Sequence, residues 1–200
     1  MELFDSLAKR RMTRAFTSAP VERSAVEQLV YAATRGPSAG NTASLEVLVL
    51  TGDECEQYWD TTLTPERRSA FPWPGLLIAP CLLVPTVEPG AYVTRYADDD
   101  KAHTGLGTAT DGWSVPYWWV DGGAAVENVL LAATSLGLGA CFFGQFGHER
   151  AVSQRFGIPE GRRSVGTIAI GHRDSAKDRP SRSSQRPTAS PEERTHWGRW

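Results

Sequence analysis

The sequence predicts an α+β domain, and three segments carry that prediction. Residues 122–136 are apolar on nearly all sides, which is typical of a helix buried in the middle of a domain. Residues 45–50 read Leu-Glu-Val-Leu-Val-Leu before a Thr-Gly-Asp turn, and residues 164–170 form a second apolar run, so both predict strands. The expected order is helices, strands, helices and a strand. It lacks the regular alternation of parallel βαβ units, which favours the α+β class.

The N-terminal region is expected to be helical. Residues 2–10 place apolar side chains at helical spacing and predict a short amphipathic helix that ends at Arg10. Pro20 precedes a second amphipathic helix over about 22–34.

The middle of the chain contains a second strand and a long aromatic segment. Residues 76–87 are apolar and predict a strand, in which Pro80 and Pro85 favour a sheet edge or the strand's ends. Residues 88–120 look irregular, and a loop of that length either has a function or contains an unrecognised helix. A further helix is expected over 148–156.

Composition limits the class of protein. The chain has 200 residues with 40% apolar and 22% charged side chains, which suits one globular domain over residues 1–200. The three cysteines are widely spaced and fit neither a disulfide framework nor a zinc site. The net charge of −2 argues against a nucleic-acid partner, and no apolar run is long enough for a membrane span. With no secretory signal at the N-terminus, we expect a cytoplasmic protein.

The charge is uneven along the chain. The segment from about residue 172 to 200 is expected to be an extended C-terminal arm, and seven Lys or Arg against four acids give it a net +3. A basic arm is either a solvated segment or one that wraps around an anion.

Residues 10–14, Arg-Arg-Met-Thr-Arg, form the strongest ionic cluster, here called the arginine segment. On a helix Arg10 and Arg14 would share a face. Two converging guanidinium groups can neutralise a phosphate monoester. The alternative is that these arginines simply stabilise a helix C-terminus.

Residues 36–41, here called the Ser38 loop, interrupt two apolar segments. Pro37 fixes one φ angle, Gly36 and Gly40 allow positive φ, and Ser38 and Asn41 offer side-chain hydrogen bonds. Such a loop is either a tight connection or part of a ligand site. Together with the arginine segment it suggests a polar ligand that carries a phosphate.

Other chemistry has little support in the sequence. The four histidines have no metal-ligand spacing, and the acids at 98–100 suit solvated loop charge better than a cation site. Gly137 and Gly139 follow a helix rather than opening one, so they suit a helix end that leads into a buried strand or loop better than a dinucleotide site. Gly144, after Phe143, would let a flat ligand approach the backbone.

Taken together, these segments resemble the nitroreductase family of FMN-dependent oxidoreductases. The match comprises, in the family's order, residues 10–16, residues 37–41, residues 137–144, and Gly171 followed by Arg186-Pro187. The resemblance implies a mainly antiparallel sheet flanked by helices. It also implies an intertwined homodimer with FMN in each of two interface sites.

The resemblance further implies a role for each segment. The arginine segment would lie along the phosphate, ribityl chain and pyrimidine edge, and the Ser38 loop would reach the flavin from the partner subunit. The pair at 143–144 would lie near flavin N5, and the arm would close on the phosphate. Met12 departs from the family's usual serine. The implied flavin-binding residues are Arg10, Arg11, Met12, Arg14, Pro37, Ser38, Ala39, Asn41, Phe143, Gly144 and Arg186.

The implied activity needs no catalytic side chain, because the flavin carries the electrons. Hydride would pass from NADH or NADPH to FMN N5 and then to a small electron-poor acceptor such as a nitroaromatic or quinone, with ping-pong kinetics. Arg10 or Arg11 would stabilise the reduced ring. The aromatic residues 113–119 would either roof the pocket or pack in the dimer core.

Two alternatives remain open at this stage. The first is an FMN-dependent dehydrogenase or oxidase that acts on a biosynthetic intermediate. The second is a protein without catalysis, either a flavin carrier or a binding module with a basic arm.

Overall fold

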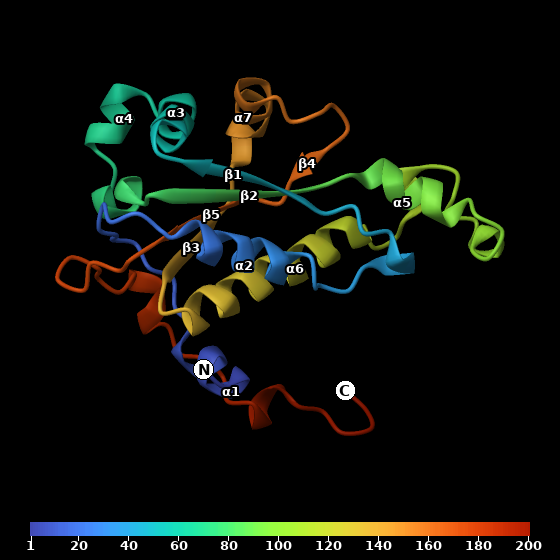
Figure 1. The fold of residues 1–200 in the computed structure, drawn as a ribbon. Coiled ribbons are helices and arrows are strands. Elements are labelled where there is room, and N and C mark those ends of the chain that lie inside the picture. Colours follow the sequence, from blue (N-terminus) through green and yellow to red (C-terminus); the bar gives the residue numbers. More distant parts are fainter.

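The computed structural model describes residues 1–200, apart from the side chains of residues 182 and 185. A five-stranded sheet lies between two groups of helices, with α3, α4 and α7 on one face and α2 and α6 on the other (Figure 1). The helices and strands are α1 (Leu3–Lys9), α2 (Arg23–Ala33), β1 (Glu46–Thr51), α3 (Asp53–Thr62), α4 (Pro65–Ser69), β2 (Cys81–Val87), α5 (Pro89–Tyr96), α6 (Tyr117–Ser135), β3 (Gly139–Phe143), α7 (Glu149–Phe156), β4 (Arg163–Ser164) and β5 (Thr167–Gly171).

The sheet has the order β1-β2-β5-β3, with β4 paired to β2, and every one of these pairings is antiparallel. Because side chains alternate along a strand, the two faces of the sheet contribute to two separate hydrophobic cores. On β2, Leu83 faces the helices α2 and α6, whereas Leu82 and Val84 face α3 and α7. The α+β class and the mainly antiparallel sheet predicted from the sequence are both confirmed.

The expectation that prolines place the second strand at an edge is wrong. Strand β2 is fully buried between β1 and β5. Pro80 precedes the strand, where a missing N–H costs nothing. Pro85 lies inside it but at the gap between β5 and β4, where the Pro85 carbonyl still accepts from the Val165 N–H at 2.9 Å. The strand can therefore hold a central position with its proline.

The helices expected at 2–10, 22–34, 122–136 and 148–156 are all present as α1, α2, α6 and α7. Helix α6 begins at Tyr117, five residues before the expected start. It ends at Ser135, and the φ of 74° at Gly137 lets the Leu138 N–H reach back to the Ala133 carbonyl at 2.8 Å. That turn sends the chain directly into β3.

The aromatic segment 88–120 contains an unrecognised helix, α5, and two short 3-10 turns. The rings of Tyr92, Trp113 and Trp118 are buried and pack on one another, whereas Tyr117 is exposed. The rings of Tyr92 and Trp113 meet edge to face at 5.9 Å, and Trp118 closes the same cluster. This satellite core fixes α5 against the start of α6.

The start of the arm runs alongside residues 15–17. The Thr17 N–H donates to the His172 carbonyl at 2.9 Å, and the Asp174 N–H donates to Ala15 at the same distance. Beyond residue 178 the arm contains two short 3-10 turns, at Arg182–Gln185 and Glu192–Arg194. None of the helices in the part of the chain described here is long and apolar enough to cross a membrane.

Candidate flavin site

The arginine segment lies beside the first residues of β3. Met12 and Ala140 form a parallel bridge, and the Thr13 N–H donates to the Ala140 carbonyl at 2.8 Å. The close approach requires glycine at position 139, because a Cβ there would lie 2.9 Å from the Thr13 side chain. Pairing with Ala140 therefore fixes the position of the arginine segment relative to strand β3.

A buried carboxylate organises the positive charge of this segment. Asp178, at the start of the arm, has a fully buried side chain. It accepts hydrogen bonds from the guanidinium groups of Arg11 and Arg173, each at 2.7 Å, and from the backbone N–H of Arg14 at 2.9 Å. Three arginines against one carboxylate leave a local net charge of +2.

The side chain of Arg14 is not neutralised. None of the ion pairs among the described side chains includes it. It is half-buried, lies 5.3 Å from the Trp73 ring centre, and reaches only the Met12 carbonyl, at 3.4 Å. Its charge also acts on the nearby Cys141: burial raises the pKa of that thiol, and Arg14 opposes the rise. A half-buried guanidinium with so little compensation suits an anionic ligand.

The far end of β3 supplies the other predicted contact. Gly144 follows four residues after Ala140, about 13 Å along the strand direction. The Phe143 ring is occupied by the core, since it stacks on Trp59 at 5.7 Å with a 20° interplanar angle. The exposed Phe146 ring lies next to Gly144, where a Cβ would be 3.1 Å from it.

Arg186 lies in the arm, eight residues after Asp178, and its side chain is exposed. The arginine segment and the root of the arm thus lie together beside the start of β3, with Gly144 at the other end of that strand. The Ser38 loop is not part of that group.

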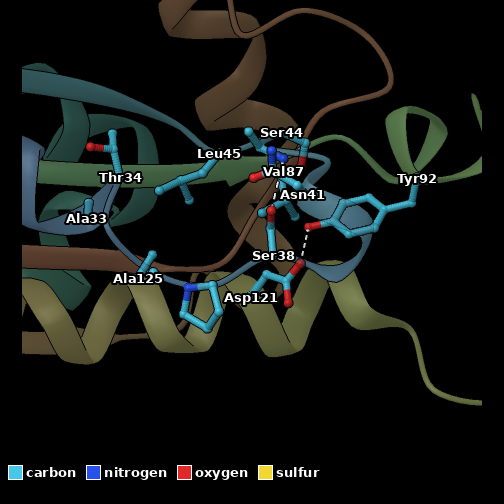
Figure 2. A pocket seen from close by; sticks show the side chains of 13 residues that line it. Ala33, Thr34, Ser38, Asn41, Ser44, Leu45, Val87, Tyr92, Asp121 and Ala125 are labelled. Atoms are coloured by element: carbon cyan, nitrogen blue, oxygen red, sulfur yellow. Dashed lines mark hydrogen bonds between the residues drawn. The ribbon is translucent and has the colours of Figure 1, made fainter. Parts of the chain in front are cut away.

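The Ser38 loop lines a separate cavity of about 320 Å³ at the other end of α6 (Figure 2). Asp121, in the first turns of α6, forms the wall opposite the loop. One of its carboxylate oxygens accepts from the Tyr92 hydroxyl at 2.7 Å and from the Ala39 N–H at 2.8 Å. Burial, together with the hydrogen bond to Asp121, raises the pKa of Tyr92, so the phenol remains a donor. Ser38 and Asn41 also line the cavity.

The Ser38 loop and the part of the arginine segment that pairs with β3 lie near opposite ends of α6, although Arg10 reaches back to Glu127, six residues from Asp121. Asp121 contacts the Ser38 loop, and Leu136 caps the end of α6 shortly before β3; fifteen residues of helix separate them. At about 1.5 Å per residue, this is about 22 Å. The helix runs directly between the two ends (Figure 1).

Sequence reasoning missed four of the residues that shape these sites. Asp178 and Arg173 bond each other locally, but the contacts that place them in the site, Asp178 with Arg11 and Arg14 and the bridge of Arg173 to Phe16, involve residues near the other end of the chain. Tyr92 was one of many aromatic residues in an irregular segment. Asp121 preceded the predicted start of its helix, where an acid is typical of a helix terminus.

Comparison with known proteins places the chain in a family. The sequence pattern described as "Nitroreductase family" matches residues 7–172, which is most of the chain. The chain belongs to the nitroreductase family of oxidoreductases, as the sequence resemblance predicted.

Individual relatives agree with that assignment. A protein of Archaeoglobus fulgidus, provisionally named NADH dehydrogenase/NAD(P)H nitroreductase, is 25% identical over 181 residues, 88% of each chain. Among solved structures, nitroreductase CinD from Lactococcus lactis in complex with 4-nitrophenol superposes with a TM-score of 0.73 at 20% identity, covering 94% of this chain and 100% of the other. A protein of Bacteroides thetaiotaomicron with the same provisional name reaches 0.70 at 17% identity, covering 99% and 98%.

Proposed function

We propose that the protein is an FMN-dependent oxidoreductase that uses NADH or NADPH to reduce small electron-poor acceptors, such as nitroaromatics or quinones. We also propose that its two sites lie between two copies of the chain. The observation that carries the proposal is the arginine segment, with a net charge of +2 and an uncompensated Arg14 beside β3.

The residues present fit the phosphate end of FMN. A phosphate monoester carries nearly two negative charges at neutral pH, which matches the local charge. Arg14 supplies a guanidinium that has no competing carboxylate among the described side chains, and Arg186 on the exposed arm supplies a second. Asp178 fixes Arg11 and Arg173, so the positive charge is already ordered before a ligand binds.

The ring end of the ligand fits the other end of β3. Gly144 has no side chain of its own, so a flat ring can lie against its backbone once the exposed Phe146 ring beside it turns away. FMN, when bound, carries hydride between the nicotinamide and the acceptor, so the protein supplies binding and orientation rather than a nucleophile.

Of the two arginines that could stabilise negative charge on the reduced ring, Arg10 is the better placed to turn. Arg10 Nε lies 3.2 Å from a carboxylate oxygen of Glu127, whose side chain is 46% exposed. Arg11 instead pairs with the fully buried side chain of Asp178. A paired arginine can leave a hydrated carboxylate at little cost.

The position of the Ser38 loop supports a site shared between subunits. The Ser38 loop is held at Asp121, about 22 Å along α6 from the helix end near which Met12 bridges to Ala140, whereas Arg10 reaches back along the helix to Glu127. No hydrogen bond among the described side chains uses the side-chain amide of Asn41. That amide therefore remains available to a ligand held by a second copy of the chain. The names of the relatives support NAD(P)H as reductant, and the complex of CinD with 4-nitrophenol supports a nitroaromatic acceptor.

The proposal is tested by titrating the apoprotein with FMN and following the quenching of flavin fluorescence. Charge-assisted hydrogen bonds are worth ~1.5–3 kcal/mol each, so Arg14→Ala should weaken FMN binding by roughly tenfold to a hundredfold. Arg186→Ala should weaken it as well. Arg23→Ala is the matched control, because Arg23 is 92% exposed and pairs only with Glu27 on the same helix.

Three results would contradict the proposal. The first is unchanged FMN affinity in Arg14→Ala, and the second is a strictly monomeric protein with a full complement of flavin. The third is bound flavin that neither NADH nor NADPH bleaches under anaerobic conditions, since that would remove the assigned reductant.

A further inference from the structure

The turn over residues 39–44, which continues the Ser38 loop, has an unfavourable backbone. Gly40, Asn41 and Ala43 all have positive φ angles, of 63°, 55° and 51°. Glycine and asparagine tolerate this conformation, whereas alanine adopts it only where the surroundings impose it. Within the turn, the Ser38 hydroxyl accepts from the Ala43 N–H at 3.1 Å.

Arg95, at the end of α5, is the first side chain that imposes this backbone. Its Nε donates to the Gly40 carbonyl at 2.8 Å. Its remaining nitrogens donate to Asp100 at 2.7 and 2.8 Å and to Asp98 at 3.2 Å. The sequence favoured solvated charge for the acids at 98–100. Two of them, Asp98 and Asp100, thus orient the guanidinium that binds the turn. The Tyr96 ring closes the same side, since a Cβ on Gly40 would lie 2.8 Å from it.

Asp121 holds the turn from the opposite side. It accepts from the Ala39 N–H and from the Tyr92 hydroxyl, and no ion pair among the described side chains includes it. Its carboxylate therefore accepts from a backbone N–H and from the Tyr92 hydroxyl, the latter drawn in Figure 2, rather than pairing with a cation.

Arg162 holds the downstream end of the turn. Its side chain is only 8% exposed, and it donates to the Ser44 carbonyl at 2.7 Å. It also donates to the Thr86 hydroxyl at 3.1 Å and pairs with Glu46 and Glu88 at 3.2 and 3.5 Å. A buried guanidinium whose donors are occupied in this way is rigid.

We propose that Arg95, Asp121 and Arg162 are positioning residues that keep the 39–44 turn in its strained conformation and so present Ser38 and Asn41 to the flavin. Each comes from a different part of the fold and contacts a different backbone group of the turn. The inference rests on the proposed function for its ligand, but the hold on the turn is a property of the protein alone. Binding is stronger when the ordering of a loop is complete before the ligand arrives.

The test uses Arg95→Ala and Asp121→Ala, with Arg68→Ala as the matched control. Arg68 and Arg95 have side chains of 28% and 27% exposure, and each pairs with two carboxylates. Arg68 does not contact the turn. Two milder variants guard against misfolding. Asp121→Asn keeps an acceptor, and Arg95→Lys keeps the charge but cannot reach the carbonyl and both acids together.

The first readout is hydrogen exchange of the amides at 41–43 in the apoprotein. Loss of a hydrogen bond to a charged group should speed this exchange by roughly tenfold or more in Arg95→Ala and Asp121→Ala. Asp121→Asn should stay near the wild-type rate, and Arg95→Lys should lie between. Arg68→Ala should change the rate by less than roughly twofold.

The second readout is FMN affinity, which should fall by roughly tenfold in the two alanine variants and remain unchanged in Arg68→Ala. Exchange at 41–43 that matches the Arg68→Ala control in both alanine variants, or in Arg95→Lys if the alanine variant unfolds, would overturn the inference. Faster exchange with unaltered FMN affinity would overturn the link to binding. A wild-type protein that binds no FMN would refute the proposed function, while the exchange data would still decide the hold on the turn.

Discussion

Replacement of Asp178 by alanine should destabilise the protein and loosen its arm. Removing one member of a buried ion pair costs ~3–5 kcal/mol when the remaining charge stays buried. Here the two orphaned guanidinium groups, on Arg11 and Arg173, are 44% and 36% exposed and can hydrate, which lowers that cost. The Arg14 N–H also loses its acceptor. We therefore expect a loss of about 2–3 kcal/mol in the free energy of unfolding.

For a chain of this length, 1 kcal/mol lowers Tm by ~2–4 °C, so the Asp178→Ala variant should melt about 4–12 °C lower. Urea denaturation gives the free energy directly. Trypsin should also cut the native variant faster after Lys177, because the root of the arm is no longer held. Glu27→Ala removes an exposed ion pair and should shift Tm by less than about 1–2 °C. Equal melting of the two variants would show that the buried carboxylate does not hold the arm.

Three further changes test the packing. Burial raises the pKa of Cys55 to about 11, and of Cys81 and Tyr58 to about 12. The contribution of these neutral groups to the free energy of unfolding is complete below their unfolded pKa values, near 9 for the thiols and 10 for the phenol. It is lost as pH rises towards 12, at ~1.4 kcal/mol per pH unit and group. Equal urea midpoints at pH 8 and 10.5 would refute this expectation. Ala43→Gly should cost less than ~0.5 kcal/mol or stabilise in urea denaturation, since relief of the positive φ offsets the entropy of glycine. Gly166→Ala should cost about 3 kcal/mol by the same measurement, because its Cβ would lie 2.5 Å from the Phe142 ring; a change below about 1 kcal/mol would contradict that packing.

Local chemistry made part of this molecule predictable. Helix α6 was recognised because residues 122–136 are apolar on nearly all sides, and the arginine segment because guanidinium groups suit phosphate wherever they converge. Helix α3 was missed although Cys55, Tyr58, Trp59 and Thr62 recur at helical spacing and are all buried. Four acids between and around those residues hid the pattern.

Long-range pairing was beyond sequence reasoning. Arg173 is near Asp178 in sequence, but its other partners, Arg11 and Arg14, lie more than 160 residues away, so nothing near that aspartate indicates them. The prolines of β2 misled for a similar reason, since their tolerance depends on a gap between two other strands. The separation of the Ser38 loop from the arginine segment also follows only from the folded path of α6.

The length of α6 has a genetic consequence if two copies combine as proposed. A mutant polypeptide lacking Arg14 and another lacking Asn41 would each be defective in a different half of the crevice. Co-expressed, they would assemble heterodimers in which one crevice inherits both lesions and the other inherits neither. Two null alleles of the same gene would then complement each other, to at most about half the activity of the normal dimer in each mixed pair.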